Sequence, residues 1–279
     1  MVRLARALVA LAVITSTPAS VAHGGLLLRY GGHRGQVAVY RLSIRATGQQ
    51  VSLGERRPIS IEAKFELREE ITATESAGTI TVRIVPTVIS ARDSTGAFGN
   101  GERSRFPTVE ITMDDRGEIL ATRPLSEEHV GPYQRAFASL MAAPGAVMPT
   151  GPAVVGDSWT SESNGSRQTS RLTAVRRGSY GIVARVESVI KAPIRVQEES
   201  VALGLKTTVS GNETQTSVLD LLADTGVVLR NKGVARSVTK GQAVLQLSEG
   251  PKVFSITSDI GFNFDLRLIR LDGKPIRSD

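Results

Sequence analysis

The sequence predicts a mainly β protein: a strongly curved antiparallel sheet or sheets, or a half-barrel, in two loosely repeated halves with one amphipathic helix at about residues 132–143. Three observations lead to this fold class. Most segments alternate apolar and polar residues, which is typical of a strand with one dry and one solvated face. Two stretches carry the same hairpin signature, and one segment has helical spacing. A parallel sheet fits less well, because its strands are apolar on both faces.

The first 22 residues have the composition of a secretory signal peptide. Arg3 and Arg6 supply positive charge, residues 7–14 form an apolar run, and Ser20-Val21-Ala22 offers the small side chains of a cleavage site. The run is too short to span a bilayer. We therefore expect an exported protein, periplasmic or extracellular, whose mature chain begins near His23, with Ala19 as a second cleavage point.

The clearest alternation lies in two neighbouring segments, residues 59–71 and 80–88. Their apolar positions are Ile59, Ile61, Ala63, Phe65, Leu67 and Ile71 in the first, and Ile80, Val82, Ile84 and Val88 in the second. Pro86 cannot donate a hydrogen bond to a ladder, so the second strand is expected to be an edge or to bend there. Further alternating segments lie at residues 37–44, 107–113, 182–190, 242–247 and 252–270.

The segment with helical spacing is residues 132–143. Its apolar residues are Tyr133, Ala136, Phe137, Leu140 and Met141. Pro132 suits a first helical turn, and Pro144-Gly145 is a stop signal. We expect a helix of about three turns whose apolar stripe packs on a sheet face.

The hairpin signatures are residues 109–123 and 217–233. Each contains an Asp-Xaa-Gly turn, at Asp115-Arg116-Gly117 and at Asp224-Thr225-Gly226. The similarity indicates a duplication, with chance resemblance among hairpins as the alternative. A joint rich in proline and glycine before Trp159 divides the mature chain into a first β half that carries the helix and a second β half, residues 23–145 and 146–279. Trp159, the only tryptophan, is expected to be a buried anchor where the halves meet.

Composition excludes several classes of function. The chain has no cysteine, which removes disulfides, thiolate metal sites, a cysteine nucleophile and the lipid-modified cysteine of a bacterial lipoprotein. Lys and Arg number 34 against 27 Asp and Glu, and they alternate with glutamate on the same segments, so we interpret them as solvated strand faces. With aromatic residues at 4%, no nucleic-acid partner is expected. Weak contact with an anionic membrane surface stays open.

No motif signals catalysis. The three histidines, His23, His33 and His129, are far apart in the sequence and lack metal-ligand spacing. The sequence contains neither a phosphate-binding glycine motif nor a Gly-Xaa-Ser-Xaa-Gly elbow. We therefore expect a protein that is not an enzyme and has no cofactor and no metal. A polar cleft joining His33 or His129 to Asp and Ser would reverse this expectation.

The C-terminal segment raises the question of what its apolar face covers. Residues 254–268 would form a strand of about 50 Å, far longer than the usual 17 to 20 Å, so it must coil strongly or break at Gly261. Seven large apolar side chains on one face cannot stay in water. We expect a ligand-binding cavity lined by Phe65, Leu67, Ile84, Phe254, Ile256, Phe262 and Phe264.

The combination of a signal peptide, amphipathic strands, one helix and a joint that ends in Gly156-Asp157-Ser158-Trp159-Thr160 resembles uncharacterised secreted bacterial β-proteins. The architecture is similar to the LolA/LppX type of lipoprotein or lipid carrier, in which a curved sheet and helices surround an apolar cavity. This resemblance implies an apolar ligand, either a lipid or a lipidated partner. The alternative is a structural or adaptor β-protein of the cell envelope with a closed core.

Overall fold

The computed structural model describes residues 25–52, 54–75, 78–94, 106–125, 145–163, 165–200 and 205–276. The predicted signal peptide and the predicted helix at 132–143 lie outside these ranges. Within them the chain is mainly strand, which confirms the predicted fold class, and these residues contain no helix.

The strands form one antiparallel sheet with the order β5-β4-β3-β2-β1-β11-β10-β9-β8-β7-β6, and β12 pairs with β11. Their bounds are Val37–Ser52 (β1), Glu55–Thr74 (β2), Ile80–Asp93 (β3), Val109–Met113 (β4), Ile119–Pro124 (β5), Ser158–Ser163 (β6), Ser166–Gly178 (β7), Gly181–Ser200 (β8), Leu205–Leu222 (β9), Val228–Leu247 (β10), Gly250–Leu271 (β11) and Lys274–Pro275 (β12). Neighbouring strands in the sheet are also consecutive in the sequence, except for β1 and β11. The first and last long strands therefore meet in the middle of the sheet, and β5 and β6 are its free edges.

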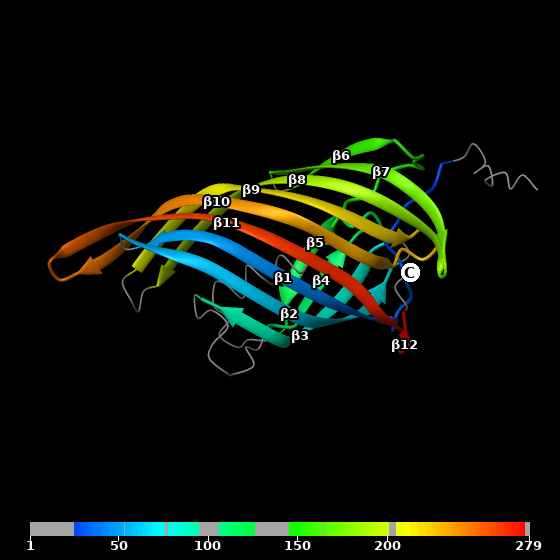
Figure 1. Ribbon diagram of the computed structural model, residues 1–279, viewed down its shortest axis with the longest axis horizontal. Coiled ribbons are helices and arrows are strands. Elements are labelled where there is room, and N and C mark those ends of the chain that lie inside the picture. The colour runs from blue at the N-terminus through cyan, green and yellow to red at the C-terminus, as the bar shows by residue number, and fades with distance from the viewer. Residues whose placement is uncertain are drawn as a thin grey trace, which may run out of the picture.

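The sheet is strongly curved, and its long strands arch side by side (Figure 1). Four glycines within the strands face the same side of the sheet, and a Cβ atom on any of them would collide with a carbonyl oxygen of the neighbouring strand. They are Gly48, Gly211, Gly233 and Gly241. Because only glycine permits so close an approach, these positions allow the sheet to coil.

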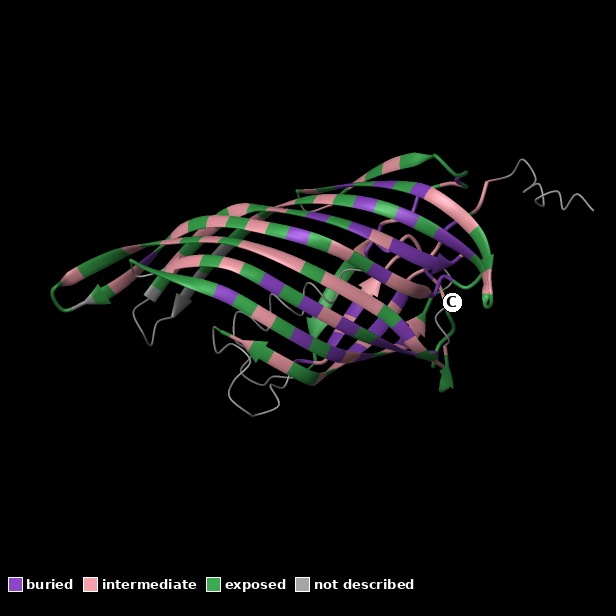
Figure 2. Cartoon of the chain, in the orientation of Figure 1, coloured by how far each residue is buried: buried purple, intermediate pink, exposed green. Residues whose placement is uncertain are grey.

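The buried core lies at one end of the arch (Figure 2). There two extended segments, residues 25–31 and 145–153, pack against the sheet. They pair with each other through Leu26 and Ala153 at N to O distances of 2.8 and 2.9 Å. The largest fully buried side chains at this closed end are Leu28, Phe65, Leu67, Met148, Leu172, Leu219 and Leu221. Beyond it the strands continue as an open half that is less buried.

Both predicted Asp-Xaa-Gly hairpins are confirmed, at the β4–β5 and β9–β10 connections. They also have a shared role that the sequence did not indicate. The Tyr30 amide donates to the Asp115 carbonyl at 2.7 Å. On the other side, a Cβ atom on Gly226 would collide with the Gly31 nitrogen. The two turns therefore hold the N-terminal segment between them.

The fold also shows where several other residues and segments named by the sequence analysis lie. β4 pairs with β3 only from Ile80 to Ile84, so Pro86 lies just beyond, where β3 is an edge. Gly261 does not interrupt β11, which runs unbroken for 22 residues. Trp159 is partly buried against the core, and its Nε1 donates to the Val147 carbonyl at 2.6 Å. The strands of the two predicted halves lie on opposite sides of the β1–β11 contact.

Candidate ligand-binding face

Most of the strand side chains in the core belong to one face of the sheet, which we call the inner face, and the segments at residues 25–31 and 145–153 pack against it. Residues of this face that pair on neighbouring strands form rows that run across the sheet. One row contains Ser170, Ser188, Ser217, Gly233, Phe264, Ile44 and Ala63. The next two rows pass through Phe262 and Ile260 toward the open half. Because strand side chains alternate between faces, every second residue of β11 from Phe254 to Leu268 lies on the inner face.

The seven residues predicted to line a cavity share this inner face, but the structure separates them into two groups. Phe65, Leu67 and Ile84 are buried at the closed end, and the Phe65 ring meets the Phe106 ring edge to face at 5.2 Å between centroids. Phe254, Ile256, Phe262 and Phe264 of β11 are only partly buried. The first group supports the fold, and the second group faces the space above the sheet.

The large side chains of β11 stand between small residues of the flanking strands. Phe262 pairs with Ala46 of β1 and Ala235 of β10, and Ile256 pairs with Gly241 of β10. Ile260 follows the same arrangement beside Gly48. A ridge of large apolar side chains with small neighbours leaves room on both sides for a hydrocarbon chain.

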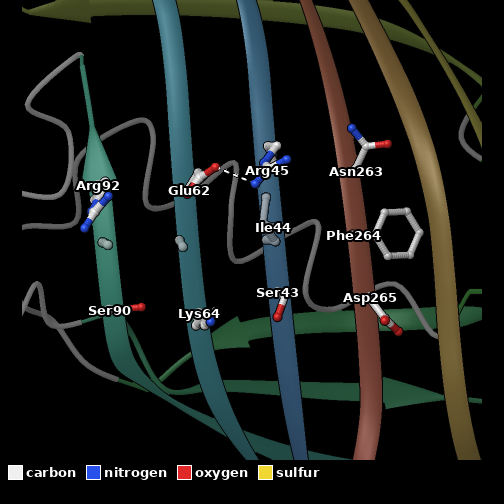
Figure 3. A pocket seen from close by; sticks show the side chains of 12 residues that line it. Ser43, Ile44, Arg45, Glu62, Lys64, Ser90, Arg92, Asn263, Phe264 and Asp265 are labelled. Atoms are coloured by element: carbon white, nitrogen blue, oxygen red, sulfur yellow. Dashed lines mark ion pairs between the residues drawn. The ribbon is translucent and has the colours of Figure 1, made fainter.

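A hollow of about 750 Å³ lies at the start of this ridge, across β3, β2, β1 and β11. Its lining forms three cross-strand rows (Figure 3). The middle row is apolar, with Ala91, Ala63, Ile44 and Phe264 on the inner face. The two flanking rows belong to the other face and are polar or charged, including the ion pair of Arg45 with Glu62 at 2.7 Å.

Phe264 also has a structural role in this region. Its ring extends from β11 toward the neighbouring strand (Figure 3). A Cβ atom on Gly233 of β10 would lie 2.7 Å from its Cζ, so the ring covers the backbone of that glycine. An aromatic ring over a strand glycine stabilises the register of the two strands.

On β7, β8 and β9 the inner face also carries polar side chains, which the sequence analysis missed. Ser170 Oγ lies 2.9 Å from Ser188 Oγ, and Gln168 Nε2 donates to Ser170 Oγ at 3.1 Å. Ser217 is fully buried, and within the described part of the chain its hydroxyl has no hydrogen-bond partner. The sequence did hold a signal for this: Gln168 and Ser170 lie at alternate positions from Leu172 and therefore share its face of the strand. In the rows through Phe264, Phe262 and Ile260, the inner face is therefore apolar on β1, β2 and β11, with hydrogen-bonding groups beside it on β7, β8 and β9.

Two glutamates also lie on the inner face and were not predicted. Burial raises the pKa of Glu69, at the closed end, to about 7. Burial likewise raises the pKa of Glu213, which lies on β9 in the row of Ile260. Glu69 interrupts the apolar alternation of β2, which is the signal that could have identified it. Glu213 follows Gly211 and precedes Gln215 on the same face of β9, so no such signal marks it.

The outer face carries paired charges, in agreement with the predicted solvated faces. Three of the ion pairs join neighbouring strands at distances from 2.6 to 2.9 Å: Arg185 with Asp220, Arg230 with Asp265, and Arg236 with Asp259. Cross-strand pairs of opposite charge stabilise adjacent strands modestly. Part of the basic surplus of the sequence is thus neutralised by pairing within the sheet.

The described ranges contain no group of three or more histidine, cysteine, aspartate or glutamate side chains that could hold a metal ion. His33 is exposed, and its Nε2 lies 3.8 Å from Asp272 Oδ2. Among the same residues, no helix has the length and hydropathy needed to cross a membrane.

No family model matches this chain, and no curated protein does either. Among solved structures, the chain is similar to one of lipid-protein interactions in lipovitellin, with a TM-score of 0.41 and 12% sequence identity. The match covers 88% of this chain and 26% of that chain, so this chain spans about a quarter of its length. The function proposed below therefore rests on this chain's own residues.

Proposed function

We propose that this protein is an exported, non-catalytic protein that binds a lipid on the inner face of its sheet. The observation that carries the proposal is the set of partly exposed apolar side chains on the inner face of β11, Phe254, Ile256, Ile260 and Phe262, which continues beyond the closed end with Ser258 among them. Exposed apolar surface of this kind is typical of a binding site. The composition of the first residues supports export.

The shape of the face suits a hydrocarbon chain. Phe262 and Ile260 have alanine or glycine neighbours on β1, and the hollow of about 750 Å³ lies next to them at Phe264. That volume is in the range of pockets that bury small ligands. A LolA/LppX type of carrier, which the sequence resembles, would use a curved sheet in the same way.

The test is mass spectrometry of an organic extract from the exported protein, purified without detergent. We expect stoichiometric lipid from the wild type. Ile256→Asp should lose it, because a carboxylate on the inner face cannot be desolvated by a hydrocarbon chain. Val253→Asp is the matched control: Val253 lies on the outer face of the same strand, is 58% exposed, and should tolerate the charge with its lipid retained.

Folding of both variants is checked by circular dichroism and thermal denaturation. Equal lipid content in Ile256→Asp and the wild type would place the ligand elsewhere. Empty extracts from all three proteins would contradict lipid binding and favour the structural or adaptor alternative.

A further inference from the structure

Glu213 is the single ionisable side chain in the central part of the inner face. The described residues in the three rows through Phe264, Phe262 and Ile260, taken from β7 to β2, are otherwise serine, glutamine, glycine, alanine, isoleucine and phenylalanine. Glu213 is flanked in its row by Ala192 of β8 and Ser237 of β10. These small neighbours leave its carboxylate accessible from the space above the sheet.

This carboxylate has no counter-charge, unlike carboxylates on the opposite face. Asp259, which precedes Ile260 on β11, accepts two hydrogen bonds from Arg236 at 2.9 and 2.6 Å. No hydrogen bond or ion pair with Glu213 occurs among the residues that the structure describes. Burial raises its pKa, which means that ionisation at this place is costly. A cation supplied by a ligand would remove that cost.

The apolar ridge lies close to this carboxylate. Ser237 pairs with Glu213 on one side and with Ile260 on the other, so one strand separates Glu213 from the ridge. Gln215, on the same face of β9, adds an amide that can hydrogen-bond a polar ligand group. The rows that contain these residues hold no lysine or arginine that could receive a phosphate.

We propose, on the basis of the lipid-binding function above, that the ligand is a long-chain cationic amphiphile whose protonated amine binds Glu213 while its hydrocarbon chain lies on Ile260, Phe262 and Ile256. The negative charge of the Glu213 carboxylate favours a positively charged amine over a neutral or anionic head group. The absence of a cation in these rows of described residues disfavours a phospholipid, because its phosphate would lose hydration without gaining a partner.

The experiment measures displacement of the neutral probe N-phenyl-1-naphthylamine from the protein by dodecylamine, dodecanol and dodecanoate at about pH 8. We expect dodecylamine to displace the probe at a concentration about tenfold or more below that of dodecanol, since a charge-assisted hydrogen bond stabilises only the amine complex. Glu213→Gln should remove this difference and leave dodecanol unchanged. Glu187→Gln, on the exposed face of β8, should retain it.

Equal affinities of dodecylamine and dodecanol for the wild type would overturn this inference while lipid binding stands. The inference would also fail if phosphatidylethanolamine competed as well as dodecylamine. Failure of every compound and of the probe to bind would instead contradict the proposed function itself. Glu213→Lys provides a second variant, in which dodecanoate should become the preferred ligand.

Discussion

At the scale of single residues, the most consequential side chains are polar ones that interrupt an apolar face. Glu69 lies at the closed end, where it lines a small cavity of about 60 Å³ with Tyr30, Tyr40 and Gln36. Burial raises the pKa of Glu69 from 4.5 to about 7, so the folded protein holds a proton that the unfolded chain releases. The free energy of unfolding therefore contains a contribution that is complete below pH 4.5 and is lost as pH rises through about 7.

Glu69→Gln should remove this dependence, because glutamine stays neutral at every pH. As pH rises from 4.5 to 8, the free energy of unfolding of the variant should increase by about 2 to 3 kcal/mol relative to that of the wild type. Urea denaturation at both pH values measures the change. A constant difference between the two proteins across this range would show that Glu69 titrates normally in the folded state.

Single residues also limit what the sequence could predict about the site. Phe254, Ile256, Phe262 and Phe264 were identified because large apolar residues at alternate positions must share a face. Glu213 was missed because its place in a row depends on pairing with β8 and β10, which no local pattern encodes.

At the scale of elements, period-two alternation predicted parts of β1, β2, β3, β8, β10 and β11, because one face of each strand is drier than the other. It did not predict β7 or the first part of β9, where the inner-face positions include polar residues. The Asp-Xaa-Gly sequences at Asp115 and Asp224 correctly predicted turns that close hairpins. They did not predict that these turns hold residues 29–31 between them. That contact joins parts of the chain that are far apart in sequence, so it depends on the sheet order rather than on local residues.

The Gly226 turn provides a test of this arrangement. Gly226 has a φ of 71°, and an added Cβ would collide with the Gly31 nitrogen and the Arg29 carbonyl. Gly226→Ala should therefore cost about 2 to 4 kcal/mol of unfolding free energy, from backbone strain and displacement of the N-terminal segment. Hydrogen exchange should also accelerate at residues 26–31.

Gly54→Ala is the matched control. Gly54 has a similar φ of 80°, in the β1–β2 turn, but an added Cβ has no neighbour within 4 Å. Its cost should be limited to about 1 to 2 kcal/mol of backbone strain. Equal destabilisation by the two substitutions, without faster exchange at residues 26–31, would contradict the proposed contact between the turn and the segment.

At the scale of the whole molecule, the sheet is closed by packed segments at one end and continues as an apolar inner face at the other. The outer face carries cross-strand ion pairs such as Arg236 with Asp259, and the corresponding inner-face positions of β1 and β11 are apolar. The predicted strong curvature followed from the length of residues 254–268. The meeting of β1 with β11 could not be predicted, because pairing of the first and last long strands leaves no local signature.

The most direct test of lipid binding on the inner face is photo-crosslinking with a diazirine-labelled alkyl lipid, followed by peptide sequencing by mass spectrometry. The account predicts adducts on the inner-face residues Phe254, Ile256, Ile260 and Phe262 of β11, and few on Val253 or other outer-face residues of the same strand. Adducts concentrated on the outer face, or spread equally over both faces of β11, would contradict it.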